Sequence, residues 1–225
     1  MKTLTREQVR QVDEIAIRRY GMSGLVLMEN AGRGVTNVMC SIGITGRVVI
    51  CCGKGNNAGD GYVIARLLQS RGHDIKIVSC CSPDSLQGDA KANHDIAVLA
   101  ELPIEYIDSD FGEWARLERE FETADWIVEG LLGTGATGEP RPPMGDLISC
   151  CNSVATAKKM ALDIPGGLDC DTGKSHRPTF RATHTCTFVA AKPGLLLEDS
   201  QQYVGELHVV DIGVPAKLLH EFGLV

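Results

Sequence analysis

The chain has 225 residues, 44% of them hydrophobic and 23% charged, with a formal net charge of −7 at pH 7. The acidic balance argues against a nucleic-acid-binding surface, which needs an excess or a stripe of basic residues. No apolar run approaches the roughly 18 residues of a membrane helix, and the polar N-terminus lacks the apolar segment of a signal peptide. A chain of this length suits one domain with a sizeable core, which we expect over residues 1–225.

Apolar periodicity predicts helices and strands that alternate along most of the chain. Thr5 and Gln8 fit a capping box at the start of a first helix, which Gly21 can end. Further helices are expected at 23–40, at a segment that carries residues 63–68 and ends near 72, and at 89–100, 111–121 and 144–154. Strands are expected at 48–52, 75–78, 104–107, 126–128, 159–162, 186–191 and 207–210, with no obvious helix between the last two. The alternation predicts an α/β fold whose mainly parallel sheet is covered by helices on both faces.

Glycine is the unusual feature of the composition. The chain has 25 glycines, and eleven of them lie in three segments, 53–61, 130–138 and 166–173. Each segment comes just after a predicted strand. Because ligands bind beyond the carboxyl ends of parallel strands, we expect the three loops to meet at one edge of the sheet and to form a binding crevice there.

The first loop, 53–61, leads from a strand into a helix, where backbone N–H groups favour phosphate. It is not a P-loop, because no Gly-Lys-Ser/Thr closes it. It also departs from the dinucleotide fingerprint, because Gly59 comes one residue late and no acidic residue ends the next strand. Asn57 and Asp60 therefore have two interpretations of equal weight: ligand contacts, or a turn residue and a helix cap.

The other two loops bring carboxylates to strand ends. Glu129 ends one predicted strand, and Asp163 ends another, which is a usual place for a catalytic carboxylate in this architecture. Asp169 and Asp171 are expected to stabilise turns. Lys192 also follows a strand; it is either solvated or turned into the crevice, where it would form an acid/base pair with Asp163.

Cysteine and histidine usage bears on redox state and metals. Six of the nine cysteines form adjacent pairs, which are poor disulfide partners, so we expect buried thiols and a reducing, cytoplasmic compartment. The six histidines lack the spacing of a zinc site, which we therefore do not expect.

Six motifs occur in a fixed order, and together they cover about 190 residues: Leu-Met-Glu-Asn-Ala-Gly at 27–32, Gly-Asn-Asn-x-Gly-Asp-Gly at 55–61, Leu-Gly-Thr-Gly at 132–135, Asp-Ile-Pro-x-Gly at 163–167, Lys-Pro-Gly-Leu at 192–195 and Asp-Ile-Gly-Val-Pro at 211–215. In these motifs the chain resembles the NAD(P)H-hydrate epimerase family. The resemblance implies a Rossmann-like three-layer α/β/α sandwich with an N-terminal helical extension. It also implies a metabolite-repair isomerase that interconverts the R and S forms of the hydrated coenzymes NADHX and NADPHX. A separate dehydratase acts on the S form, and the resemblance further implies a homodimer.

The resemblance also implies site residues. The substrate-binding positions correspond to Asn56, Asn57, Ala58, Gly59, Asp60, Gly133, Thr134, Gly135, Ala136, Thr137, Gly138, Glu139 and Asp163. One potassium ion per subunit is expected at Asn57, Glu129 and Gly166. Three positions depart from the common family pattern: Glu129 replaces an Asp, Gly166 replaces a Ser, and Ala58 replaces a Gly.

Inversion at C6 of the hydrated ring needs a positioned acid/base group but no redox change. We assign this role to Asp163, with Lys192 tuning or sharing it. Loss and return of the C6 hydroxyl and ring opening with reclosure are both open as routes. Two rival functions are a non-catalytic nucleotide-binding or scaffold protein on the same fold and an NAD-dependent dehydrogenase, which the fingerprint mismatch disfavours.

Overall fold

Seven parallel strands form one sheet in the order β3-β2-β1-β4-β5-β6-β7 in the computed structural model, which describes residues 2–224. The strands are β1 Val48–Cys52, β2 Ile75–Ser79, β3 Ile104–Tyr106, β4 Trp126–Gly130, β5 Lys158–Leu162, β6 His184–Phe188 and β7 Glu206–Val210. The α-helices are α1 Arg6–Arg18, α2 Gly24–Ile42, α3 Asn56–Ser70, α4 Gly88–Leu99, α5 Trp114–Phe121, α6 Met144–Ser153, α7 Gln201–Val204 and α8 Ala216–Glu221. Three short 3-10 helices are η1 Pro83–Ser85, η2 Pro193–Leu196 and η3 Glu198–Ser200.

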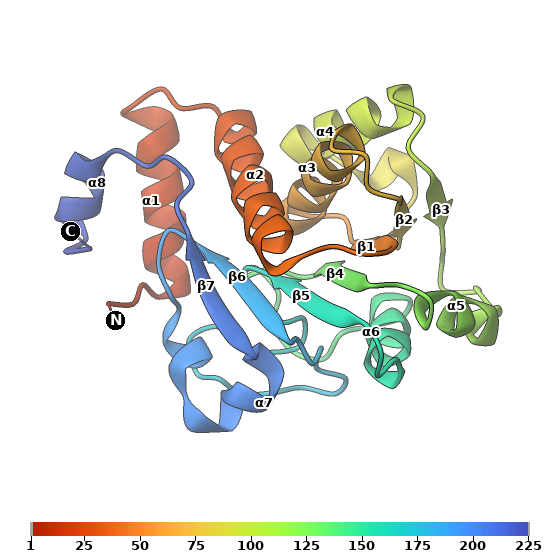
Figure 1. Cartoon of the computed structure of the whole chain (residues 1–225). Helices are drawn as coiled ribbons and strands as arrows, with labels where there is room; N and C mark the ends of the chain where they lie inside the picture. Colours follow the sequence, from red (N-terminus) through yellow and green to blue (C-terminus); the bar gives the residue numbers. More distant parts are fainter. Residues whose placement is uncertain (1, 225) are drawn as a thin grey trace.

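Helices cover both faces of the sheet, as Figure 1 shows. Side chains alternate between the two faces of a strand, so Ile50 of β1 packs in the core beneath α1, α2 and α3. Its neighbours Val49 and Cys51 pack in the second core, beneath α5 and α6. The three-layer α/β/α prediction is confirmed, and the sheet is wholly parallel.

The N-terminal helices form as the sequence predicts. The Thr5 side chain accepts from the Gln8 backbone and the Gln8 side chain accepts from the Thr5 backbone, which completes the capping box of α1. Helix α2 approaches α3 closely at Gly32, where a β-carbon would lie 2.4 Å from Val63 Cγ1. Glycine at this position therefore allows the two helices to pack against each other.

The structure corrects the sequence prediction in the last third of the chain. Strand β6 covers His184–Phe188 rather than 186–191, because Val189 has a φ of 66° and leaves the extended conformation. The connection from β6 to β7 contains η2, η3 and α7, where no helix was predicted. Helix α8 was also not predicted, and α5 begins at Trp114, three residues later than expected.

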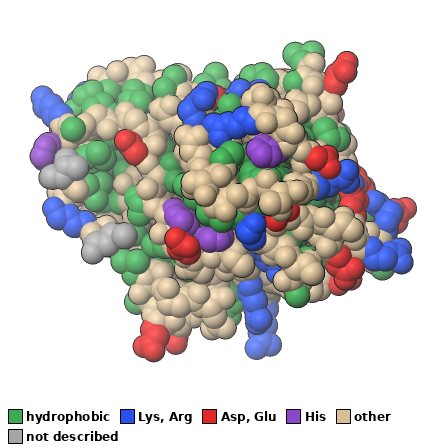
Figure 2. Space-filling model, viewed as in Figure 1, with side chains coloured by type: hydrophobic (Ala, Val, Ile, Leu, Met, Phe, Trp, Pro, Cys, Tyr) green, Lys and Arg blue, Asp and Glu red, His purple; other side chains and the backbone are tan. Residues whose placement is uncertain are grey.

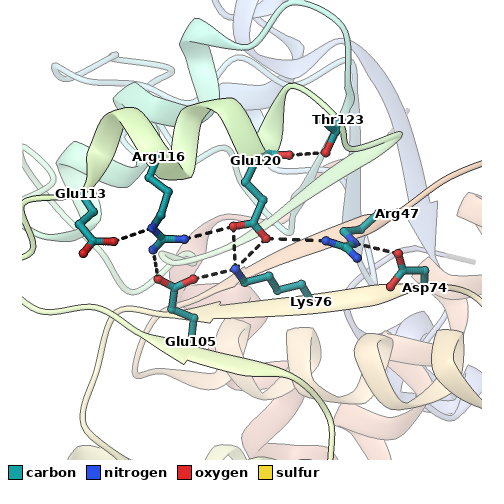
Figure 3. A network of polar contacts seen from close by, with 8 residues as sticks. All are labelled: Arg47, Asp74, Lys76, Glu105, Glu113, Arg116, Glu120 and Thr123. Atoms are coloured by element: carbon teal, nitrogen blue, oxygen red, sulfur yellow. Dashed lines mark hydrogen bonds and ion pairs between the residues drawn. The ribbon is translucent and has the colours of Figure 1, made fainter.

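Charged side chains join the outer strands to α5 (Figure 3). Lys76 Nζ of β2 lies 2.7 Å from Glu105 Oε2 of β3 and 2.7 Å from Glu120 Oε1 of α5. Arg116 of α5 contacts Glu105 and Glu113, and Arg47 extends the network to Asp74. Figure 2 shows acidic and basic side chains interspersed at this end of the molecule. Single exposed ion pairs contribute little to stability, but several charges joined in one network can contribute more.

Thiol burial agrees with the prediction for the cysteines. Cys51, Cys52 and Cys151 have no exposed surface, and all nine cysteines are free. Separately, none of the helices between residues 2 and 224 has the length and apolar character needed to cross a membrane.

Candidate active site

A cavity of about 560 Å³ opens at the carboxyl ends of the strands, against α1 and α2. The two helices contribute Val9, Arg10, Asp13, Ile17, Gly24, Leu27, Met28 and Ala31. The loops and α3 contribute Lys54, Gly55, Asn56, Asn57, Asp60, Leu131, Leu132, Gly133, Thr134, Gly135, Ala136 and Asp163. Asp89, Met144, Phe188, Val189 and Ile212 complete the lining. The loops after β1, β4 and β5 therefore meet at one edge of the sheet, as strand order requires.

Two residues of the cavity have strained backbones. Asp163, directly after β5, has a φ of 64°, and Val189, directly after β6, has a φ of 66°. Left-handed conformations are rare for residues with a β-carbon, and strain of this kind is concentrated at functional sites. Here the strain turns two neighbouring strand ends toward the same cavity.

Asp163 is held through one of its two carboxylate oxygens. Oδ1 accepts from Lys192 Nζ at 2.5 Å, from Thr187 Oγ1 at 3.1 Å and from the Phe188 backbone N–H at 3.3 Å. Oδ2 accepts no hydrogen bond from residues 2–224, while Asp163 lines the cavity. Asp163 is thus oriented from behind and keeps one free oxygen for a ligand.

Lys192 is fully buried and does not line the cavity. Its ammonium group has three protons, and Nζ donates to Asp163 Oδ1, to Thr187 Oγ1 at 2.8 Å and to the Phe188 carbonyl at 3.0 Å. All three donors are therefore used within the protein. Of the two sequence interpretations, the solvated lysine is wrong, and the geometry makes Lys192 a positioning residue for Asp163.

Three more carboxylates line the cavity, those of Asp13, Asp60 and Asp89. Burial, together with the nearby negative charge of Asp163, raises the pKa of Asp13 to about 6, although Lys192 lowers it in part. Burial raises the pKa of Asp60 well above its usual value, with Asp163 and Asp13 adding to the effect. The cavity thus combines the Asp163–Lys192 ion pair with carboxyl groups that retain protons at higher pH than usual, as acid/base sites require.

Glu129 is completely buried at the end of β4. Its Oε1 accepts from the backbone N–H groups of Leu131 at 2.8 Å and Leu132 at 3.2 Å, and its Oε2 accepts from that of Gly166 at 2.8 Å. Burial raises the pKa of Glu129 to about 7, and the three hydrogen bonds oppose this rise. A β-carbon on Gly166 would lie 3.1 Å from Glu129 Oε1, so the longer acid occupies space that a side chain at 166 would need.

The structure places Asn57 and Asp60 inside α3, so neither the turn nor the cap interpretation holds. Gly55 is the N-cap residue of α3. Asn57 Nδ2 donates to the carbonyl groups of Leu132 at 2.8 Å and Leu162 at 2.7 Å. Asn57 therefore joins the first loop to the loop after β4 and to the end of β5.

Two positively charged side chains line the cavity, and one of them lies near the glycine loop. Arg10 and Lys54 both line the cavity, and a β-carbon on Gly135 would lie 3.9 Å from an Arg10 guanidinium nitrogen. Of the other expected substrate-binding residues, Ala58 and Gly59 are buried behind the cavity wall. Thr137 and Gly138 line a second, smaller crevice beside Gly166. Glu139 is exposed and lines neither space.

Sequence reasoning missed Arg10 and Asp13, which α1 brings to the cavity. The available signal was local: Asp13 lies directly after Val12 on the apolar stripe of α1, where a carboxylate is unusual. Nothing in the spacing indicated that α1 would lie over the ends of β5 and β6.

Residues 24–194 match the model of a protein family described as "YjeF-related protein N-terminus". A protein of Pirellula staleyi named NAD(P)H-hydrate epimerase is 46% identical over 217 residues, which are 96% of this chain and 94% of that protein. A protein of the same name from Rhodopirellula baltica is 40% identical and covers 98% of this chain and 88% of its own length. A bifunctional NAD(P)H-hydrate repair enzyme of Moorella thermoacetica is 35% identical, and the match covers 97% of this chain and 42% of that enzyme. The crystal structure of the yeast protein ynu0 superposes with a TM-score of 0.82 at 22% identity, over 99% of this chain and 94% of that chain, which shows a shared fold.

Proposed function

Because the chain belongs to the family of YjeF-related N-terminal domains, we propose that it is an NAD(P)H-hydrate epimerase, which interconverts the R and S forms of NADHX and NADPHX. The observation that carries this proposal is the cavity in which Asp163 presents one free carboxylate oxygen, and which the carboxyl groups of Asp13, Asp60 and Asp89 also line. Such a cavity suits proton transfer without redox chemistry.

The cavity wall is divided in a way that fits a dinucleotide. We assign the pyrophosphate to the glycine loop 133–136, where Arg10, Lys54 and the first N–H groups of α3 supply positive charge. Apolar side chains such as Leu27, Met28 and Phe188 line the same cavity and suit the hydrated nicotinamide ring. Local cations and amide dipoles thus compensate for the net charge of −7.

The chemistry requires an acid and a base at C6. When the C6 hydroxyl leaves, a carboxyl group donates a proton to it while the lone pair of ring nitrogen N1 stabilises the cation. A carboxylate then accepts a proton from the water that adds to the other face. We assign one role to Asp163 through Oδ2, positioned by Lys192, and the second role to Asp13, whose pKa of about 6 suits either direction of transfer near neutral pH.

We also propose a potassium ion near Asn57, Glu129 and Gly166. Glu129 is buried and forms no salt bridge with residues 2–224, so a cation would offset its charge. The carboxylate of Glu129, the amide of Asn57 and the carbonyl of Gly166, which accepts from Phe180 N–H at 2.8 Å, are oxygen donors of the kind that hard cations bind. The test is thermal unfolding: potassium should raise the Tm of the wild type but not that of Glu129→Gln.

The assembly and its setting follow as further proposals. The S form would pass to a separate dehydratase, in keeping with the bifunctional repair enzyme among the relatives. We place the protein in the cytoplasm because its nine cysteines are free thiols. A homodimer would cover Ile17 of α1 and Leu25 and Val26 of α2, which are between 42% and 47% exposed. Light scattering coupled to size-exclusion chromatography tests the dimer.

A coupled assay tests the proposed function. A dehydratase specific for the S form should stop when the S form in a mixture of R- and S-NADHX is consumed. Addition of this protein should let the reaction run to completion. If the R form persists while the protein still binds an ADP-ribose-type ligand, the protein is a nucleotide-binding module rather than an epimerase.

A further inference from the structure

Two histidines and a glutamate meet at the amino ends of the last two strands. His184 begins β6, and Glu206 and His208 lie on β7, the edge strand of the sheet. In the parallel pairing of β6 and β7, His184 lies opposite Glu206, and Cys186 lies opposite His208. Since alternate residues share a face, the three side chains project from the same side of the sheet. Figure 2 shows histidine side chains gathered next to an acidic one over these strands.

The distances among the three side chains match a metal coordination sphere. His184 Nδ1 lies 3.3 Å from His208 Nε2. Glu206 brings Oε2 to 3.6 Å from His184 Nδ1 and Oε1 to 3.7 Å from His208 Nε2. In a tetrahedral zinc site with ligands at about 2.0–2.1 Å, two ligand atoms are about 3.3 Å apart. The two imidazole nitrogens already have this separation, and the exposed Glu206 side chain is free to adjust.

The two imidazoles are held in place by their surroundings. Both rings are partly buried and lie 5.5 Å apart between centroids, and the His184 ring lies 5.5 Å from that of Trp126. Trp126 is fixed by a hydrogen bond from Nε1 to the Gly43 carbonyl at 3.0 Å. The only nearby cation among the described residues is Lys158, which also contacts Gly43 and forms a salt bridge with Asp125. Its charge is thus partly compensated.

We propose that His184, Glu206 and His208 form a binding site for a divalent transition-metal ion of the zinc type. Imidazole nitrogens select such ions over Mg²⁺ and Ca²⁺, and three protein ligands leave a fourth position for water. His184 begins β6, and Phe188 at the other end of this strand lines the cavity. Four residues of strand at about 3.3 Å each place the metal site about 13 Å from the cavity. The site is therefore independent of the proposed epimerase function. The sequence offered no sign of this site, because spacing along the chain does not reveal that strand pairing brings together histidines that are 24 residues apart.

A bound ion would join β6 to the edge strand β7. Edge strands have hydrogen-bonded neighbours on one side only, and β7 has one partner in the sheet, β6. A ligand that binds only the folded chain stabilises it. We therefore expect Zn²⁺ to raise the thermal stability of the protein in a concentration-dependent way.

Isothermal titration of the metal-free protein with ZnCl₂ tests the proposal. We expect one Zn²⁺ per chain in the wild type and loss of that binding in His184→Ala and His208→Ala. Glu206→Gln, at an exposed position, should weaken binding on the order of tenfold or more, which corresponds to about 1.4 kcal/mol or more. His220→Ala removes an exposed histidine elsewhere and should bind like the wild type.

Two further readouts separate binding at this site from binding elsewhere or loss of fold. Co²⁺ should give a visible absorption band in the wild type that is absent in His208→Ala. Circular dichroism of Glu206→Gln should match the wild type, so weaker binding by this variant cannot come from unfolding. The proposal is overturned if the wild type binds no stoichiometric Zn²⁺, or if binding persists in His184→Ala and His208→Ala.

Discussion

Glu129 and Gly166 should behave as an interdependent pair. The common family pattern has Asp and Ser at these positions, and this chain has a longer acid facing a residue without a side chain. The Glu129 carboxylate accepts hydrogen bonds from three backbone N–H groups, at N···O distances of 2.8, 3.2 and 2.8 Å. Glu129→Asp shortens the side chain by one methylene and draws the carboxylate away from these donors. Gly166→Ser alone places a β-carbon 3.1 Å from both Glu129 Oε1 and Ile148 Cδ1.

The structure sets the size of each effect. A buried N–H group that loses its partner costs about 1–3 kcal/mol, and partial loss at three sites brings Glu129→Asp to about 2–4 kcal/mol. Overpacking at Gly166 costs about 1–3 kcal/mol, with no backbone strain added because its φ is not positive. In the double variant the shorter acid vacates the space that the serine needs. We expect a favourable coupling of about 1–3 kcal/mol.

Urea unfolding of the wild type, both single variants and the double variant measures this coupling. Gly112→Ser is the control, because Gly112 is exposed and a β-carbon there meets nothing within 4 Å. If the two single effects add to within about 0.5 kcal/mol, the two residues do not compete for space and our explanation of the Glu–Gly pair is wrong.

Three other expectations follow from the same geometry. Lys192→Met leaves Asp163 buried without its cation and should lower the free energy of unfolding, measured with urea, by about 3–5 kcal/mol. Adding Asp163→Asn to this variant removes the unpaired charge and should restore part of the lost free energy of unfolding. The folded state raises the pKa of Asp13 from 3.8 to about 6, so its stabilising contribution is complete below pH 3.8 and is lost as pH rises through 6. Asp13→Asn should remove this part of the pH dependence of stability, and an unchanged profile would refute the shift. Gly53→Ala places a β-carbon 2.2 Å from the Leu131 carbonyl and should lower the Tm, whereas Gly55→Ala, which meets nothing within 4 Å, should not.

Much of the fold could be predicted from local patterns. The two-sided burial of β1 and the capping box of α1 depend on residues within a few positions of one another. The placement of Asp163 at a strand end was also readable, because an apolar run preceded it and parallel strands share a carboxyl edge. These features depend on sequence neighbours and on one architectural rule.

The rest depends on contacts between segments far apart in the chain. Val189 is β-branched and favours a strand, yet its φ of 66° ends β6, a conformation set by the surrounding structure rather than by propensity. Asp13 reaches the cavity only because α1 packs over the strand ends. His184 and His208 become neighbours only through the register of β6 and β7. No spacing rule applied to one segment contains this information.

The rate at which a single epimer of NADHX inverts is the most direct test of the proposed mechanism. Pure S-NADHX incubated with the wild type should reach the equilibrium mixture of epimers, as resolved by chromatography. Asp163→Asn keeps a side chain of the same shape but cannot transfer the proton, and should lower the rate by about 10²–10⁴-fold with circular dichroism unchanged. Inversion by a folded Asp163→Asn at the wild-type rate would contradict the assignment of Asp163 as the acid/base group.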